Sequence, residues 1–138
     1  GADEARERAL AAFGLNLGIC FQMVDDLLDF TADERVLGKP VANDLREGKL
    51  TQEVMLMLRR GGAAAREAVR CVVEDRGFER VSREVIVRLV REHGALDEAR
   101  RLAERYAEQA RRDLDVFPPS PFRDALLSLP DFILARDH

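Results

Sequence analysis

The sequence predicts an all-α fold, and three observations support this. Apolar residues recur at steps of three or four through most of the chain, as they do on one face of an α-helix. Glycines and prolines separate these segments, at Gly61-Gly62, Gly77, Gly94 and Pro118-Pro119. No segment reads as a convincing strand, because alternation of apolar and polar residues is not sustained. We therefore expect the 138 residues to form helices around one modest core, in a single domain.

The first predicted helix begins at Asp3, a good N-cap residue, and ends near Phe30. Gly14 and Gly18 lie one turn apart within it, and each weakens the helix by about 1 kcal/mol relative to alanine. Close packing against another helix is the preferred explanation for this pair, and room for a ligand is the alternative.

A loop is expected from Thr31 to Leu50, with a short turn around residues 42–47. Thr51 is suited to cap a helix that ends near Arg60. Amphipathic helices follow at 63–76, 81–93 and 96–117. Ser120-Pro121 should open the last helix, in which Pro130 should cause a kink or a break.

Composition excludes several classes of function. The formal net charge of -4 gives no electrostatic reason to expect a nucleic-acid partner. The least polar run, residues 9–24, is too short and interrupted to predict a membrane span, and no signal peptide is recognisable at the start. Cys20 and Cys71 lack the spacing of metal ligands. We expect both to be reduced core thiols in a cytoplasmic protein.

A cluster of three aspartates is the first sign of a functional site. Asp25, Asp26 and Asp29 follow an uncharged segment, and no Lys or Arg occurs between Ala9 and Glu34. Two like charges four residues apart on a helix cost roughly 0.2 to 0.5 kcal/mol, and the apolar neighbours add a burial penalty. A bound cation would relieve both. Carboxylate oxygens suit Mg²⁺, which binds few protein groups and takes its other ligands from water and phosphate.

The only two lysines among the 22 basic residues are the second sign. Lys39 and Lys49 each follow a glycine and lie within twelve residues of each other. A lysine ammonium is a compact point charge that can approach a phosphate, and a glycine lets the backbone come close to a ligand. The alternative is that both are solvated loop lysines.

These residues together resemble a known family. The segment FQMVDDLLD at 21–29, followed by Gly38-Lys39, Asp44-Leu45 and GKLT at 48–51, is similar to the second aspartate-rich region of the trans-polyprenyl (isoprenyl) diphosphate synthases. The similarity extends to the end of the chain, at residues 119–138. Members of the family commonly have Leu-Pro after this threonine, whereas this chain has Gln52-Glu53.

The resemblance implies a fold and an activity. The fold would be the C-terminal helices of the isoprenoid synthase helical bundle. The activity would be that of a prenyltransferase of isoprenoid biosynthesis, which condenses isopentenyl diphosphate with an allylic diphosphate and uses Mg²⁺. The full-length protein would be a homo-oligomer, as a dimer.

The resemblance also implies the roles of the aspartates in metal binding and catalysis. Asp25 would be the principal metal ligand, and Asp29 would support the metal directly or through water. Asp26 would orient these groups without binding the metal itself.

The remaining implied roles concern the substrate. Lys39 and Lys49 would bind the diphosphate leaving group, and Asp44 would position a lysine. Gln22 would face the reaction centre and help orient the substrate.

A complete synthase needs a facing aspartate-rich region, which these 138 residues lack. We therefore interpret residues 1–138 as one partial domain, the C-terminal part of a synthase without the N-terminal half and its first aspartate-rich motif. Such a chain would be inactive alone. The alternative is a noncatalytic subunit or interaction domain that pairs with a catalytic synthase chain.

Overall fold

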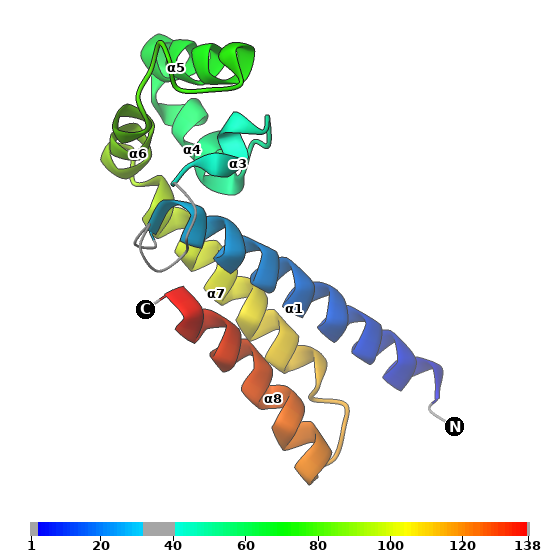
Figure 1. Cartoon of the computed structure of the whole chain (residues 1–138). Helices are drawn as coiled ribbons and strands as arrows, with labels where there is room; N and C mark the ends of the chain where they lie inside the picture. The colour runs from blue at the N-terminus through cyan, green and yellow to red at the C-terminus, as the bar shows by residue number, and fades with distance from the viewer. Residues whose placement is uncertain (1–2, 32–40, 138) are drawn as a thin grey trace. The chain divides into compact units, whose positions relative to one another are not determined.

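The computed structural model describes residues 3–31 and 41–137. Helices and turns account for these residues, with no β-strand among them, so the predicted all-α class is confirmed (Figure 1). The elements are α1 (Glu4–Thr31), α3 (Asn43–Arg46), α4 (Gln52–Arg60), α5 (Gly62–Asp75), α6 (Arg83–Glu92), α7 (Ala95–Asp113), α8 (Pro121–Leu134) and the 3₁₀ helix η1 (Ala135–Asp137).

The chain divides into two compact units. Unit 1 comprises Gly1–Val24 with Arg101–His138, and unit 2 comprises Asp25–Arg100. Helices α1 and α7 each contribute to both units. The single partial domain proposed from the sequence stays a prediction.

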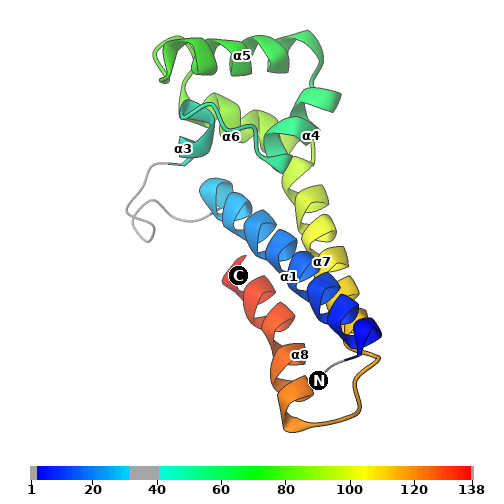
Figure 2. The same ribbon diagram turned by 90° about the vertical axis from the view of Figure 1, so that its right-hand side faces the viewer.

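Unit 1 is built from α8 and the parts of α1 and α7 that belong to it, which lie side by side in both views (Figures 1 and 2). Its α7 segment contributes small buried side chains, Ala103, Ala107 and Ala110, before Leu114. Alanines four or three residues apart lie on one face of a helix and let a neighbouring helix approach closely. Cys20, Met23 and Val24 of α1 and Ile133 of α8 complete the core.

Polar contacts hold the same helices together. Asn16 Nδ2 of α1 donates a hydrogen bond of 2.7 Å to Asp113 Oδ2 at the end of α7. Arg111 forms an ion pair with Asp131 of α8. Ser120 caps α8 by accepting a hydrogen bond from the Arg123 backbone N–H at 3.2 Å, as its Ser-Pro sequence predicts.

Unit 2 surrounds the C-terminal end of α1. Its fully buried side chains come from every helix of the unit, including Phe30, Leu45, Met57, Val72 and Ile86. Gly61 separates α4 from α5 where an added Cβ would lie only 3.0 Å from the Met57 carbonyl oxygen, so this turn needs a glycine. Arg60 donates to the His93 carbonyl oxygen at 2.9 Å, which ties the end of α4 to the end of α6.

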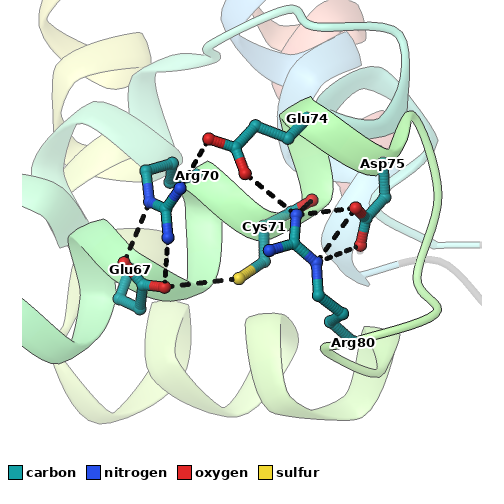
Figure 3. Close-up of polar contacts among 6 residues, drawn as sticks. All are labelled: Glu67, Arg70, Cys71, Glu74, Asp75 and Arg80. Carbon is teal, nitrogen blue, oxygen red and sulfur yellow. Dashed lines mark hydrogen bonds and ion pairs between the residues drawn. The ribbon is translucent and has the colours of Figure 1, made fainter.

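A network of charges secures the end of α5 (Figure 3). Arg80 donates to Glu74 and Asp75 and, at 3.4 Å, to the carbonyl oxygen of Cys71. Arg70 bridges Glu67 and Glu74 one turn on either side. These carboxylates are all paired with arginines, so the network serves to fix the chain reversal after Asp75.

Two local predictions were wrong. Helix α7 ends at Asp113 rather than near Phe117, because Leu114 and Asp115 turn back to bond Arg111 and Arg112, three residues earlier. Pro130 does not interrupt α8, where its ring is buried. Within the described residues no atom lies within 4 Å of a Cβ added at Gly14 or Gly18, so the reason for this glycine pair stays a prediction.

Both cysteines are free and buried, as predicted. Helix α1 is long and apolar enough to cross a membrane, by length and composition only. Core helices of soluble proteins pass the same test, and the expected absence of a membrane span stays a prediction.

Candidate functional site

Lys49 is held between two aspartates in unit 2. Its Nζ lies 2.7 Å from Asp26 Oδ1 on α1 and 2.7 Å from Asp44 Oδ2 on α3. Burial alone would lower the pKa of Lys49, but its hydrogen bonds to Asp26 and Asp44 outweigh burial and raise that pKa above its usual value. The ammonium therefore stays charged at neutral pH. Its single positive charge is shared between the two carboxylates.

The backbone before Lys49 explains its position. Gly48 has a φ of 86°, which is the left-handed region that favours glycine. With this turn the Gly48 N–H bonds the Leu45 carbonyl at 2.9 Å, and the Lys49 N–H bonds the Asp44 carbonyl at 2.9 Å. These bonds close the C-terminal end of α3 and direct the chain so that Lys49 returns to Asp44 and α1.

Asp29 connects the aspartate-rich end of α1 to α3. Its two carboxylate oxygens accept backbone N–H bonds from Asn43 and Asp44, both at 3.3 Å, and its carbonyl accepts one from Ala42 at 2.9 Å. Burial raises the pKa of Asp29, and the two N–H bonds partly oppose that effect. The side chain therefore has a structural role in addition to the metal-binding role suggested by the sequence.

The other sequence-predicted residues are placed differently. Asp25 is exposed, next to the nearly buried Asp26 on α1. Gln22 is exposed too and lies three residues earlier, in unit 1. Lys39 lies outside the described residues. The structure thus brings together Asp26, Asp29, Asp44 and Lys49, while the contribution of the remaining three stays a prediction.

Glu53 is a residue of this site that the sequence interpretation missed. It is fully buried in the first turn of α4, and neither of its carboxylate oxygens has a hydrogen-bond partner in the described part of the chain. Burial raises its pKa to about 7, and the negative charges of Asp26 and Asp29 contribute to the increase. The backbone N–H of Glu53 itself and the Thr51 hydroxyl favour the carboxylate form and partly oppose this increase, although neither makes a hydrogen bond of ordinary geometry to it.

Two signals could have pointed to Glu53. It occupies a position where the resembling family commonly has proline. It also shares the face of α4 that carries Leu56 and Met57, at helical spacings of three and four, and both of those side chains are buried.

The donor set fits a magnesium ion only as half of a site. Among residues 3–31 and 41–137, no group of three or more His, Cys, Asp or Glu side chains is arranged to hold a metal. Asp25 and Asp29 supply two carboxylates four residues apart on one helix. Mg²⁺ is commonly bound through one or two protein carboxylates, with water and substrate phosphates as the other ligands. These two side chains therefore fit the ion in the presence of a phosphate ligand.

Comparison with known proteins extends over the whole chain. The chain is 36% identical over 138 residues to an octaprenyl diphosphate synthase of Haemophilus influenzae, covering all of this chain and 42% of that protein. It is also 36% identical to a geranylgeranyl diphosphate synthase of Methanosarcina mazei, covering all of this chain and 41% of that protein. The chain thus spans about two fifths of the length of these relatives.

A solved structure gives the same result. The fold matches a polyprenyl synthase of Caulobacter crescentus, complexed with calcium and isoprenyl diphosphate, with a TM-score of 0.84 and 36% identity. This match covers all of the chain and 42% of that protein. The model of the family described as polyprenyl synthetase matches residues 1–89, which include all the sequence-predicted site residues. The chain belongs to the polyprenyl synthetase family.

Proposed function

We propose that this chain is the C-terminal part of a polyprenyl diphosphate synthase and carries the second aspartate-rich half of its active site. The reaction is the Mg²⁺-dependent condensation of isopentenyl diphosphate with an allylic diphosphate. The allylic C–O bond breaks, the double bond of isopentenyl diphosphate forms a new C–C bond with the cation, and a proton is lost. The arrangement of Lys49 between Asp26 and Asp44, beside the exposed Asp25, supports this assignment most strongly.

Lys49 is suited to bind the diphosphate group. Its ammonium has three N–H donors, two of which point to Asp26 and Asp44. The side chain is about half exposed, so the third donor is available for a phosphate oxygen. Because the aspartates hold the ammonium in place, it meets the developing negative charge of the leaving group without first losing conformational freedom. Lys39 would contribute a second ammonium, and Gln22 would orient the substrate.

Asp25 and Asp29 would hold the metal. When bound, Mg²⁺ neutralises charge on the diphosphate as it leaves. The backbone N–H bonds to Asp29 keep its carboxylate in a fixed orientation, and each oxygen retains a lone pair for the metal or for a water. Asp26, already paired with Lys49, acts by orienting that lysine.

The exposed apolar side chains of α1 support the proposal that this helix contacts groups outside the 138 residues. Leu10, Leu15 and Phe21 are 42%, 65% and 46% exposed, and the helix is open at Gly14 and Gly18. In the proposed complete enzyme, this surface would line the hydrocarbon pocket or contact the N-terminal half. The complete enzyme would act in the cytoplasm as a homodimer.

The proposal can be tested on the 138-residue chain by calorimetry with inorganic pyrophosphate, with and without Mg²⁺. We expect weak binding that requires Mg²⁺ and is lost in both Asp25→Ala and Lys39→Ala. The matched control is Asp124→Ala, which removes an exposed aspartate from the first turn of α8 in unit 1. Binding that is unaffected by Mg²⁺ and by both site substitutions would show the site assignment to be wrong.

A further inference from the structure

Arg83 ties the start of α6 to the segment just before α3. Its Nη1 donates a hydrogen bond of 2.7 Å to the Val41 carbonyl oxygen, across 42 positions of the chain. Its guanidinium carbon lies 4.2 Å from the centroid of the Phe78 ring. Stacking on a ring face and bonding to a carbonyl together hold a guanidinium in one orientation. Arg83 is partly buried, whereas Arg88 of the same helix is exposed, so Arg83 is placed to hold this backbone.

The backbone after Val41 needs support from other parts of the chain. Ala42 is fully buried and has a φ of 56°, in the left-handed region that residues other than glycine rarely adopt. Its N–H donates to the Asp29 carbonyl oxygen of α1 at 2.9 Å. Helix α3 begins at the next residue and has only four residues, too few for a helix to be stable by itself. Its start is held from two sides, by Asp29 of α1 and by Arg83 of α6 acting at Val41.

Helix α3 in turn places the Asp44 groups that hold Lys49. The Asp44 carboxylate accepts a hydrogen bond of 2.7 Å from Lys49 Nζ, and the Asp44 carbonyl accepts one of 2.9 Å from the Lys49 N–H. Asp44 follows Val41 by three residues, so a shift of the backbone at Val41 would move both acceptors. The other partner of the ammonium, Asp26, lies on α1 and would not move with them. The direction of the ammonium therefore depends on where α3 is held against the end of α1.

We propose that Arg83 is a positioning residue for the diphosphate site: by holding the Val41 carbonyl, it fixes α3 and the Asp44 carboxylate that directs Lys49. This inference rests on the proposed function of Lys49 as a diphosphate-binding group. Arg83 acts through the backbone of residues 41–44 and is itself a ligand of neither the diphosphate nor the metal. Without Arg83 the ammonium would keep its charge and lose its fixed direction, so binding of a diphosphate would first have to order α3.

The first measurement needs no ligand. Because the chain has only two lysines, the ammonium ¹H–¹⁵N signal of Lys49 can be assigned by NMR. In the wild type we expect its two bonds to aspartates to protect this signal from exchange with water. In Arg83→Met, which keeps an apolar side chain and removes the donors, the signal should broaden or disappear. The side-chain amide signal of Asn16, which is hydrogen-bonded within unit 1, should stay unchanged and reports that the chain is folded.

The second measurement is calorimetry of the 138-residue chain with pyrophosphate and Mg²⁺. We expect Arg83→Met to bind roughly tenfold more weakly than the wild type, a loss typical of residues that orient a ligating group. Arg83→Lys retains a donor for the Val41 carbonyl and should restore most of the affinity and the Lys49 signal. Arg88→Met is the control, because it removes an equal charge from an exposed position of the same helix. Its affinity should stay within about twofold of the wild type, since an exposed charge contributes little.

A Lys49 signal that is unprotected in the wild type, or is the same in Arg83→Met, would overturn the inference and leave the proposed function intact. Equal losses of pyrophosphate binding in Arg83→Met and Arg88→Met would overturn it too, because the lost positive charge would explain them. A loss that Arg83→Lys does not restore, or an unfolded Arg83→Met chain, would overturn it by assigning Arg83 to the stability of the fold. A folded wild type that binds no pyrophosphate would overturn the proposed function, and this inference with it.

Discussion

Lys49 and the residues around it show how much of a site one lysine can organise. It connects α1 to α3 through Asp26 and Asp44, and Gly48 supplies the turn that makes this reach possible. Both ion pairs involve a half-exposed ammonium, so their contribution to stability is reduced by solvent screening. Their main consequence is to fix the direction of the charge, and this is the property that a diphosphate-binding group needs.

Glu53 should make the stability of the fold depend on pH. Its pKa is raised from 4.5 to about 7 in the folded chain, so folding favours its protonated form. That contribution is fully present below pH 4.5 and is lost as pH rises through about 7. The shift corresponds to a loss on the order of 3 kcal/mol for a fully buried group. Denaturant unfolding of the wild type and Glu53→Gln at pH 5 and pH 8 should show this difference.

We expect Glu53→Gln to be as stable as the wild type at pH 5 and more stable at pH 8. Glu47→Gln serves as the comparison, since Glu47 is exposed and should show no such divergence. If the free energies of unfolding of the wild type and Glu53→Gln change in parallel between the two pH values, then Glu53 is not buried in solution as it is here.

At the residue scale, the sequence predicted which side chains belong to the site more readily than which of them bond to each other. The lack of basic residues near Asp25, Asp26 and Asp29, and the restriction of lysine to two positions, identified the segment. The sequence could not show that Lys49 reaches Asp26 across 23 positions, because this contact depends on how α3 folds back on α1. It also could not show that Asp29 caps α3, because this depends on how Asn43 and Asp44 come to lie beside the end of α1.

The elements themselves were largely predictable from their periodicity and their ends. The bounds of α1, α4 and α5 lie within one residue of those predicted, since Asp3, Thr51 and the glycines at 61 and 62 mark them clearly. The end of α7 was missed because Leu114 to Phe117 continue the apolar pattern although their backbone forms turns. Thr51 occupies the cap position of α4, but its hydroxyl makes no capping bond.

Asp29 allows a prediction at the level of α3. This helix has only four residues. The backbone N–H groups of its first two residues, Asn43 and Asp44, donate hydrogen bonds to the Asp29 carboxylate. Replacing a capping carboxylate by alanine typically costs about 1 kcal/mol. Asp29→Ala should therefore increase amide hydrogen exchange at Asn43 and Asp44 roughly fivefold, as measured by NMR, if local opening controls exchange.

Asp25→Ala is the matched control for this measurement. It removes an exposed aspartate one turn earlier on the same helix and leaves the Asp29 carboxylate in place. We expect unchanged exchange at both amides in this variant. Equal exchange in Asp29→Ala and the wild type would mean that these two long hydrogen bonds contribute nothing to the stability of α3.

At the scale of the whole molecule, two compact units share two long helices, and the relatives are more than twice as long as this chain. Each unit has its own buried core, while large apolar side chains remain exposed on α1 and α8. Exposed apolar surfaces of this kind mark sites of interaction, so we expect this chain to bury them against a partner. The sequence alone could not show which apolar faces stay exposed, because this depends on how the helices pack.

The apolar face of α8 leads to a prediction about assembly. Phe122, Leu129 and Phe132 are 84%, 39% and 71% exposed and lie on one face of the helix with Ala125. A second copy of the chain can cover this face with its own apolar face. We therefore expect sedimentation velocity to show association that increases with concentration. The double variant Phe122→Ser and Phe132→Ser should shift the chain toward monomer.

Val73→Ser, which changes an exposed apolar residue of α5, is the control and should leave the association unchanged. A chain that stays monomeric at all concentrations would show that this face does not bring two copies together.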